Sequence, residues 1–385
     1  MGALVFLVTS QFAYPNGVLF SLSYTYTFTQ IFKHIMKTKL LSLTFLLSLV
    51  IESYSQTLGD FKPKDQKYGM NKVKDAKRIY ISNFTVNFQV YNEKEDFKQG
   101  GSIFGGGVKG DAKAELSIGL TGLSETDVQQ ITDKLYQDFI AQIKAKGLEV
   151  ISADEAGKSD TYEDYIKMQG GKASLSQFPG MVTTSPTGYE WYVKSVDKDG
   201  KTKSGGFLNR SEALFPKLSK SLGDAIIGEV NLYVMFVEDQ NAFKGAGANI
   251  KVKTNLRLAD QEAIVMTSNA KIKLKGQNQI VPISSEVSFY HGKMGLGSTS
   301  AYVGSLGKPL EIADVIEDTK LQSFAKNDAD VLGMSNGTYR IFNPDNKESA
   351  STKTIKVESK KYIDGVLMAG KQFIDYHVQS FLKDF

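Results

Sequence analysis

Hydrophobic and polar residues alternate in several stretches of the chain, which is the pattern of strands with one buried face. The first such stretch runs from Ile79 to Val90, and its phase changes at Ser82–Asn83. One extra residue moves every later side chain to the other face, so this change predicts a β-bulge. Similar alternation predicts further strands at 112–120, 250–258 and 264–274. The last two are expected to pair as an antiparallel ribbon with one buried face and one solvated, basic face.

Other stretches show the three-and-four spacing of an amphipathic helix. Apolar residues recur from Val128 to Ile143, after Ser124 as N-cap and before Gly147 as a C-terminal cap. The chain then resumes as a strand at 148–151. Two further helices are predicted, a short one at 162–168 and a long amphipathic one at 361–385.

The stretch around Gly223–Asp224 organises the second half of the chain. A short helix ends there, and a nearly uninterrupted apolar run, Ala225 to Val237, follows. Such a run is typical of a central strand that is covered on both faces. A ligand could bind at a junction of this kind between helix and strand, which makes Gly223 and Asp224 candidate site residues.

The succession of strand, helix, glycine and strand predicts an α/β (α+β) fold. We expect a mixed sheet with flanking helices, an antiparallel meander in the second half and a C-terminal amphipathic helix. The expected boundaries are an extended leader at 56–77, an α/β domain at 78–290 with insertions at 92–120 and 157–216, and a C-terminal extension at 291–385. An Asp-Lys-Asp-Gly turn at 197–200 predicts a β-hairpin in the second insertion.

The N-terminal region has the features of an export signal. Basic residues at 37 and 39 precede an apolar run from Leu40 to Ile51. Residues 36–55 are therefore predicted to be a secretory signal peptide, cleaved before Gln56. The alternative, a membrane anchor, would need ~20 apolar residues. Residues 1–35 are interpreted as an upstream extension from a start codon assigned too early, or as a second segment that contacts membrane. The mature protein is expected in the periplasm or at the outer membrane of a Gram-negative bacterium.

The residue types present limit the chemistry of the chain. Its 385 residues contain no cysteine, which excludes disulfides, thiolate metal sites and a lipidated cysteine. Neither a zinc site nor a Ser-His-Asp triad is expected, because only three widely separated histidines exist: His34, His291 and His377. A cluster of carboxylates is interpreted as an exposed face, with carboxylate catalysis as the alternative: Asp160, Glu163 and Asp164. No catalytic residue, cofactor or metal is predicted.

The most concentrated charge lies on the predicted ribbon. Its wet face carries six cations: Lys251, Lys253, Arg257, Lys271, Lys273 and Lys275. This candidate interaction face could meet anionic headgroups, polysaccharide or an acidic partner, although lysines there also protect a strand edge from aggregation. The small net charge of +4 argues neither for nor against nucleic acid. Nucleic acid is not an expected partner, because no aromatic residues alternate with these lysines.

Several short motifs resemble a known family. They are the strand Arg78–Phe84, the helix end at Lys146–Gly147 with the strand after it, the glycine–aspartate segment Leu222–Val230, and the strand Asn255–Asp260. In this order they resemble the CsgG-type group of curli-secretion components, with TolB N-terminal-like periplasmic domains and penicillin-binding-protein activators. The resemblance covers roughly residues 78–275. It implies that Gly223, Asp224 and Gly228 are a signature of the fold, and that the domain is an assembly or partner-binding module rather than an enzyme.

We therefore expect an exported, non-enzymatic envelope protein that binds other envelope proteins or forms a homo-oligomer, with a link to secretion or surface-assembly machinery. Two alternatives stay open. One is a secreted hydrolase with carboxylates in the 157–216 insertion. The other is a ring-forming outer-membrane pore, because the strands within 86–120 approach the ~9–11 residues that a membrane-spanning strand needs. A hairpin packed on the protein's own core is the simpler interpretation of 86–120.

Overall fold

The computed structural model describes residues 5–13, 19–27, 57–98, 101–103, 107–109, 112–175, 178, 180–196, 202–203, 213–240, 249–267, 278–324 and 352–384. The chain divides into two compact units, Met1–Ser55 and Gln56–Phe385. In the first unit, β1 (Val5–Ala13) and β2 (Leu19–Thr27) form an antiparallel hairpin. The predicted signal peptide at 36–55 and its cleavage point before Gln56 lie outside the described residues.

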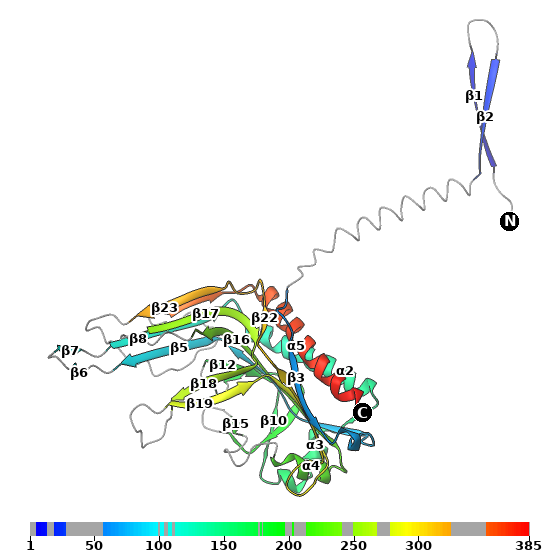
Figure 1. The fold of residues 1–385 in the computed structure, drawn as a ribbon. Coiled ribbons are helices and arrows are strands. Elements are labelled where there is room, and N and C mark those ends of the chain that lie inside the picture. The colour runs from blue at the N-terminus through cyan, green and yellow to red at the C-terminus, as the bar shows by residue number, and fades with distance from the viewer. Residues whose placement is uncertain are drawn as a thin grey trace. The chain divides into compact units, whose positions relative to one another are not determined.

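The main sheet of the second unit is built around β16 (Ile226–Asp239), as Figure 1 shows. On one side of β16 lies β4 (Arg78–Gln89), which runs parallel to it, and on the other lies β20 (Glu286–His291), which runs antiparallel. The outer strands are β12 (Met181–Thr184) and β11 (Ser174–Leu175) beyond β4, β21 (Ser300–Leu306) and β3 (Pro63–Tyr68) beyond β20, and β9 (Glu149–Val150) beside the start of β4. The predicted mixed α/β architecture with an antiparallel second half is confirmed.

The predicted bulge in the first strand is confirmed. Ile81 of β4 lies opposite Gly228 of β16, and Asn83 lies opposite Glu229, so Ser82 is the extra residue. Ser82 is buried, and its hydroxyl donates to the carbonyl oxygen of Gly228 at 3.2 Å. Gly228 itself lies so close to its neighbours that an added Cβ would approach the Ile81 Cδ1 atom to 3.1 Å. The fold-signature glycine therefore serves the close packing of β16.

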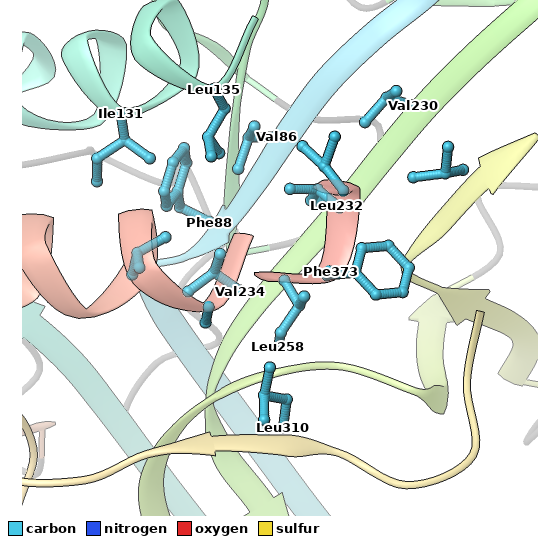
Figure 2. Packing of buried hydrophobic residues seen from close by; sticks show 14 of the residues in the cluster. Val86, Phe88, Ile131, Leu135, Val230, Leu232, Val234, Leu258, Leu310 and Phe373 are labelled. Carbon is cyan, nitrogen blue, oxygen red and sulfur yellow. The ribbon is translucent and has the colours of Figure 1, made fainter. Parts of the chain in front are cut away.

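Two helices cover one face of the sheet: α2 (Glu125–Ala145) and α5 (Ser359–Lys383). The helix α2 begins with a capping box, in which the Asp127 backbone N–H donates to Ser124 Oγ and the Ser124 N–H donates to the Asp127 carboxylate. The apolar stripes of α2 and α5 pack on side chains of β4 and β16 in the main core. Figure 2 shows residues from all four elements: Val86, Phe88, Ile131, Leu135, Leu232, Val234 and Phe373. Both helices occur where the hydrophobic spacing predicts them.

The opposite face of the sheet is covered by smaller elements. Neighbouring strand residues point to opposite faces, and while Ile79 belongs to the main core, Tyr80 packs with α3 (Ala153–Ala156) and α4 (Phe215–Ser221) in a second core. Past the bulge this face becomes polar. Asn231 Oδ1 accepts hydrogen bonds from Thr85 Oγ1 at 2.9 Å and from Asn87 Nδ2 at 2.8 Å.

The second half of β16 continues into an arm of antiparallel strands. There β17 (Asn249–Leu258) pairs with β16 on one edge and with β22 (Leu310–Ile312) and β23 (Thr319–Phe324) on the other. The predicted pairing of 250–258 with 264–274 is therefore wrong, because both edges of β17 are already occupied. The next strand, β18 (Gln261–Thr267), pairs with β19 (Asn278–Ser284) instead.

The insertion at 92–120 forms a second layer on this arm. Its strands β5 (Tyr91–Lys98) and β8 (Ala112–Thr121) are antiparallel, with the short strands β6 (Gly101–Ile103) and β7 (Gly107–Lys109) between them. The strand β24 (Thr352–Lys356) runs parallel to β8 on its other edge. In Figure 1 these strands lie beside β17 and β23, and contacts between the two layers agree with that view.

The insertion at 157–216 differs in part from its prediction. Only a short 3-10 turn, Asp160–Tyr162, replaces the helix expected at 162–168, and β10 (Ile166–Gln169) follows it. A helix is disfavoured there because β10 pairs with β13 (Glu190–Val193), while the Tyr162 ring is buried in the second core. The strands on either side of 197–201, β14 (Ser195–Val196) and β15 (Thr202–Lys203), pair antiparallel as the predicted hairpin requires, while the predicted turn itself lies outside the described residues.

Candidate functional site

A depression opens at the end of the sheet where β4 and β16 begin. It has a volume of about 940 Å³ and is lined by the segment before β4, by the junction between α4 and β16, and by the turn after β20. A second depression of about 890 Å³ adjoins it and shares four residues: Arg78, Lys220, Gly223 and Lys293. We refer to the two together as the basic depression.

The Gly223–Asp224 junction forms part of its wall. Gly223 has a φ of 74° and Asp224 a φ of 58°, so both lie in the left-handed region that ends a helix. The buried Ser219 hydroxyl donates to the Ala225 carbonyl oxygen at 2.6 Å and accepts from the Gly292 N–H at 2.8 Å. This one side chain joins α4, the start of β16 and the turn after β20, which fixes the geometry of the wall.

Positive charge dominates the lining of the depression. Two of its cations are compensated: Arg78 donates to Glu155 Oε1 at 2.6 Å, and Lys220 lies 3.4 Å from the Asp224 carboxylate. Five lysines make no ion pair with any residue that the structure describes: Lys72, Lys77, Lys158, Lys217 and Lys293. The acidic side chains left to offset them are Asp75 and Asp160. The depression is therefore suited to a negatively charged ligand.

His291 lies at the base of the turn in the depression. Its Nδ1 atom is buried and has no hydrogen-bond partner among the described residues. Burial lowers the pKa of His291, an effect that the charge and backbone of Asp224 partly offset. The ring is therefore neutral at pH 7 and adds no positive charge of its own.

The hydroxyl groups around the depression serve to hold loops together. Ser159 Oγ and Ser221 Oγ lie 2.7 Å apart in a mutual hydrogen bond, and Ser219 bonds to two backbone groups. Neither arrangement pairs a hydroxyl with a general base. The arrangement can thus bind and orient an anion.

The six residues of the predicted basic face have different surroundings. Lys253 lies 2.9 Å from the Asp318 carboxylate, and Lys251 lies near it on β17. Arg257, predicted to be solvated, is only 1% exposed: it binds Glu262 through two nitrogens, at 2.8 and 2.7 Å, and donates to the Val237 carbonyl oxygen at 2.8 Å. Alternation placed Arg257 outside, whereas the β18 turn folds Glu262 over it. The other three lie outside the described residues: Lys271, Lys273 and Lys275.

The other candidate residues are spread over the fold. Gly223 and Asp224 lie in the basic depression, and Gly228 lies inside the sheet. Of the clustered carboxylates, Asp160 lines the depression, while Glu163 and Asp164 are exposed. In the part of the chain that the structure describes, no three His, Asp or Glu side chains come together as a metal site would require.

Sequence reasoning missed the lysines of the basic depression. They come from four separate segments: the approach to β4, the end of α3, helix α4 and the turn after β20. The available signal was the basic run at 72–78, Lys-Val-Lys-Asp-Ala-Lys-Arg, directly before a predicted strand. Only the parallel pairing of β4 with β16 brings that run beside Gly223.

Comparison with protein-family models, with curated proteins and with solved structures yields no match. The likeness to the CsgG-type group therefore remains a prediction from short motifs. Among the described helices, none has the length and apolarity that crossing a membrane would require.

Proposed function

We propose that the protein is an exported, non-enzymatic binding or assembly module of the cell envelope that engages a negatively charged partner at the basic depression. The observation that carries this proposal is the set of five lysines around the Gly223–Asp224 junction that make no ion pair within the described part of the chain. Lysines near an anionic surface contribute about 1 kcal/mol each at moderate ionic strength. Several acting together are enough for selective, salt-dependent binding.

The junction supports this proposal by its construction. The wall is held in place by the Ser219 hydrogen bonds and by the Arg78–Glu155 ion pair, so the lysines project from a preformed surface. A preformed site loses less entropy when it binds. The glycine–aspartate segment Leu222–Val230 thus both begins the central strand and shapes the site.

Binding to a defined polyanion tests the proposal. The triple variant Lys72→Gln/Lys77→Gln/Lys293→Gln removes three lining cations that make no ion pair with described residues, and fluorescence anisotropy would follow its binding to labelled poly-L-glutamate. We expect a loss of affinity of at least about tenfold at low salt, and a weaker salt dependence, because fewer charges interact with the polymer.

A matched variant separates local from overall charge. Lys64→Gln/Lys353→Gln/Lys383→Gln changes the net charge equally at exposed lysines that do not line the depression. It should bind almost as well as the unmodified protein, with both variants melting at the same temperature. Equal losses in the two triple variants would mean that general charge, and not this site, attracts the polymer.

A further inference from the structure

The turn between β20 and β21 presents bare apolar side chains at the rim of the basic depression. Met294 is 62% exposed and Leu296 is 97% exposed. Scattered exposed leucines are common on protein surfaces. Here, however, a third exposed apolar residue, Tyr68, lies close by and is 54% exposed. Its hydroxyl donates to the carbonyl oxygen of Ser298, in the same turn, at 3.3 Å. Three of the five large hydrophobic residues recorded as exposed in the described part of the chain thus gather at this turn.

The turn holds these side chains outward by its own hydrogen bonds. The Met294 N–H donates to the Gly297 carbonyl oxygen at 2.8 Å, and the Gly297 N–H donates back to Met294 at 3.0 Å. Gly295 has a φ of 61°, which a glycine adopts without strain. Below the turn, the Thr299 N–H donates to the His291 carbonyl oxygen at 2.9 Å. The exposure of Met294 and Leu296 therefore belongs to an ordered structure.

Cations surround this apolar tip. Lys293 precedes it directly, and Lys293 and Gly295 both line the depression that also holds Lys72, Lys77 and Lys220. An acidic protein segment would use the lysines but would leave the convex apolar tip in water. A bilayer with anionic lipids satisfies both, because its acyl boundary accepts apolar side chains and its headgroups pair with lysines. Tyrosine is also favoured at that boundary.

We propose that the tip formed by Tyr68, Met294 and Leu296 docks on an anionic lipid bilayer, with Leu296 entering the acyl boundary and the lysines of the basic depression lying over the headgroups. This proposal rests on the proposed function, since it names the class of anionic partner that the depression engages. It adds an apolar contact between the tip and the bilayer, whereas binding of an anion at the basic depression needs only the lysines.

Vesicle binding tests the tip. Flotation would compare vesicles of phosphatidylcholine with phosphatidylglycerol against vesicles of phosphatidylcholine alone. The unmodified protein should float only with the anionic vesicles. The variant Met294→Ser/Leu296→Ser should bind them at least about tenfold more weakly, because burying one leucine contributes more than a tenfold factor. Its binding to poly-L-glutamate should not change.

The control is Ile166→Ser, which removes an apolar side chain that is 47% exposed on β10, away from the tip. It should float as the unmodified protein does. Undiminished flotation of the Met294→Ser/Leu296→Ser variant would overturn the membrane proposal while leaving the proposed function intact. If the triple lysine variant still binds poly-L-glutamate fully, the proposed function itself fails.

A fluorescent probe gives a direct readout of insertion. Leu296→Trp in a Trp191→Phe background leaves one tryptophan, since the chain has no other. Its emission should shift to shorter wavelength on adding anionic vesicles and stay unchanged with phosphatidylcholine. An unshifted spectrum with bound vesicles would show that the tip remains in water, which contradicts the proposal.

Discussion

The layer beneath α5 and the end of the sheet at Gly223 differ in how far their side chains are buried and in whether their polar groups are paired. Under α5, large side chains such as Phe373 and Phe381 are fully buried, and the polar pair there, Tyr302 and His377, is enclosed and hydrogen-bonded. At Gly223, four segments meet, five lysines make no ion pair with any described residue, and apolar side chains lie in water. The difference separates the region that stabilises the fold from the region that is free to bind. Substitutions in one should therefore leave the properties of the other unchanged.

The largest effect is expected from Phe373→Ala. The Phe373 side chain is fully buried in the main core, visible in Figure 2, and its ring meets the His377 ring edge-on at 4.7 Å between centroids. Truncation leaves a cavity, so the free energy of unfolding should fall by about 3–5 kcal/mol. Chemical denaturation measures it. The exposed neighbour Gln372→Ala should cost almost nothing, and poly-L-glutamate affinity should stay constant in both folded variants.

The next largest effect is a pH dependence of stability from His377. Its Nε2–H donates to the Ser305 carbonyl oxygen at 3.1 Å, so Nδ1 accepts from the Tyr302 hydroxyl at 2.9 Å. Burial lowers the pKa of His377 to about 4, from 6.5 in an unfolded chain. Between these values only the unfolded state takes up the proton. Stability is therefore complete above pH 6.5 and is lost as the pH falls toward 4.

The expected loss between about pH 7 and about pH 4.5 is on the order of 2–3 kcal/mol. Urea denaturation at both pH values would measure it in a His291→Asn background, because the pKa of His291 is lowered in the same direction. Adding His377→Gln should lower stability at pH 7 and flatten the dependence. A pH dependence that persists unchanged in the double variant would assign the loss to other groups. Carboxylates such as Asp138, whose pKa is lowered mainly by a hydrogen bond to Lys134, act at more acidic pH.

The layer beneath α5 was also the more predictable of the two regions from the sequence. Helical spacing placed α2 and α5, and the phase change at Ser82 located the bulge, because each depends on residues close together in the chain. The pairing of β17 was not predictable in this way. A strand with alternating polarity fits several partners, and the choice of β16, β22 and β23 depends on edges formed by distant segments. For the same reason the alternating pattern predicts a solvated Arg257, whereas Glu262 covers it in the structure.

The basic depression was predictable only at one point. Gly223 and Asp224 stand out locally, since a glycine–aspartate pair ends a helix and begins an apolar run. The lysines around them come from several separate segments. Lys72 and Lys293 are more than 200 residues apart, and nothing in the sequence relates one to the other. Charge density along the chain pointed instead to 251–275, where a single stretch holds many lysines. A site assembled from several loops is therefore harder to find from the sequence than one strand.

The smallest effect on stability is expected from a substitution at Asp224. The same substitution should strengthen the binding of poly-L-glutamate. Its φ of 58° suits glycine, so Asp224→Gly removes strain but adds freedom to the unfolded chain, and the unfolding free energy should change by less than about 1 kcal/mol. The change also removes the carboxylate beside Lys220. Affinity for poly-L-glutamate should then rise a few-fold. Asp224→Asn, which also tolerates this conformation, should reproduce the rise if charge is its cause. If only the glycine variant gained affinity, the gain would come from the changed backbone. The affinity of the basic depression would then be limited by the geometry around Gly223 rather than by its charge.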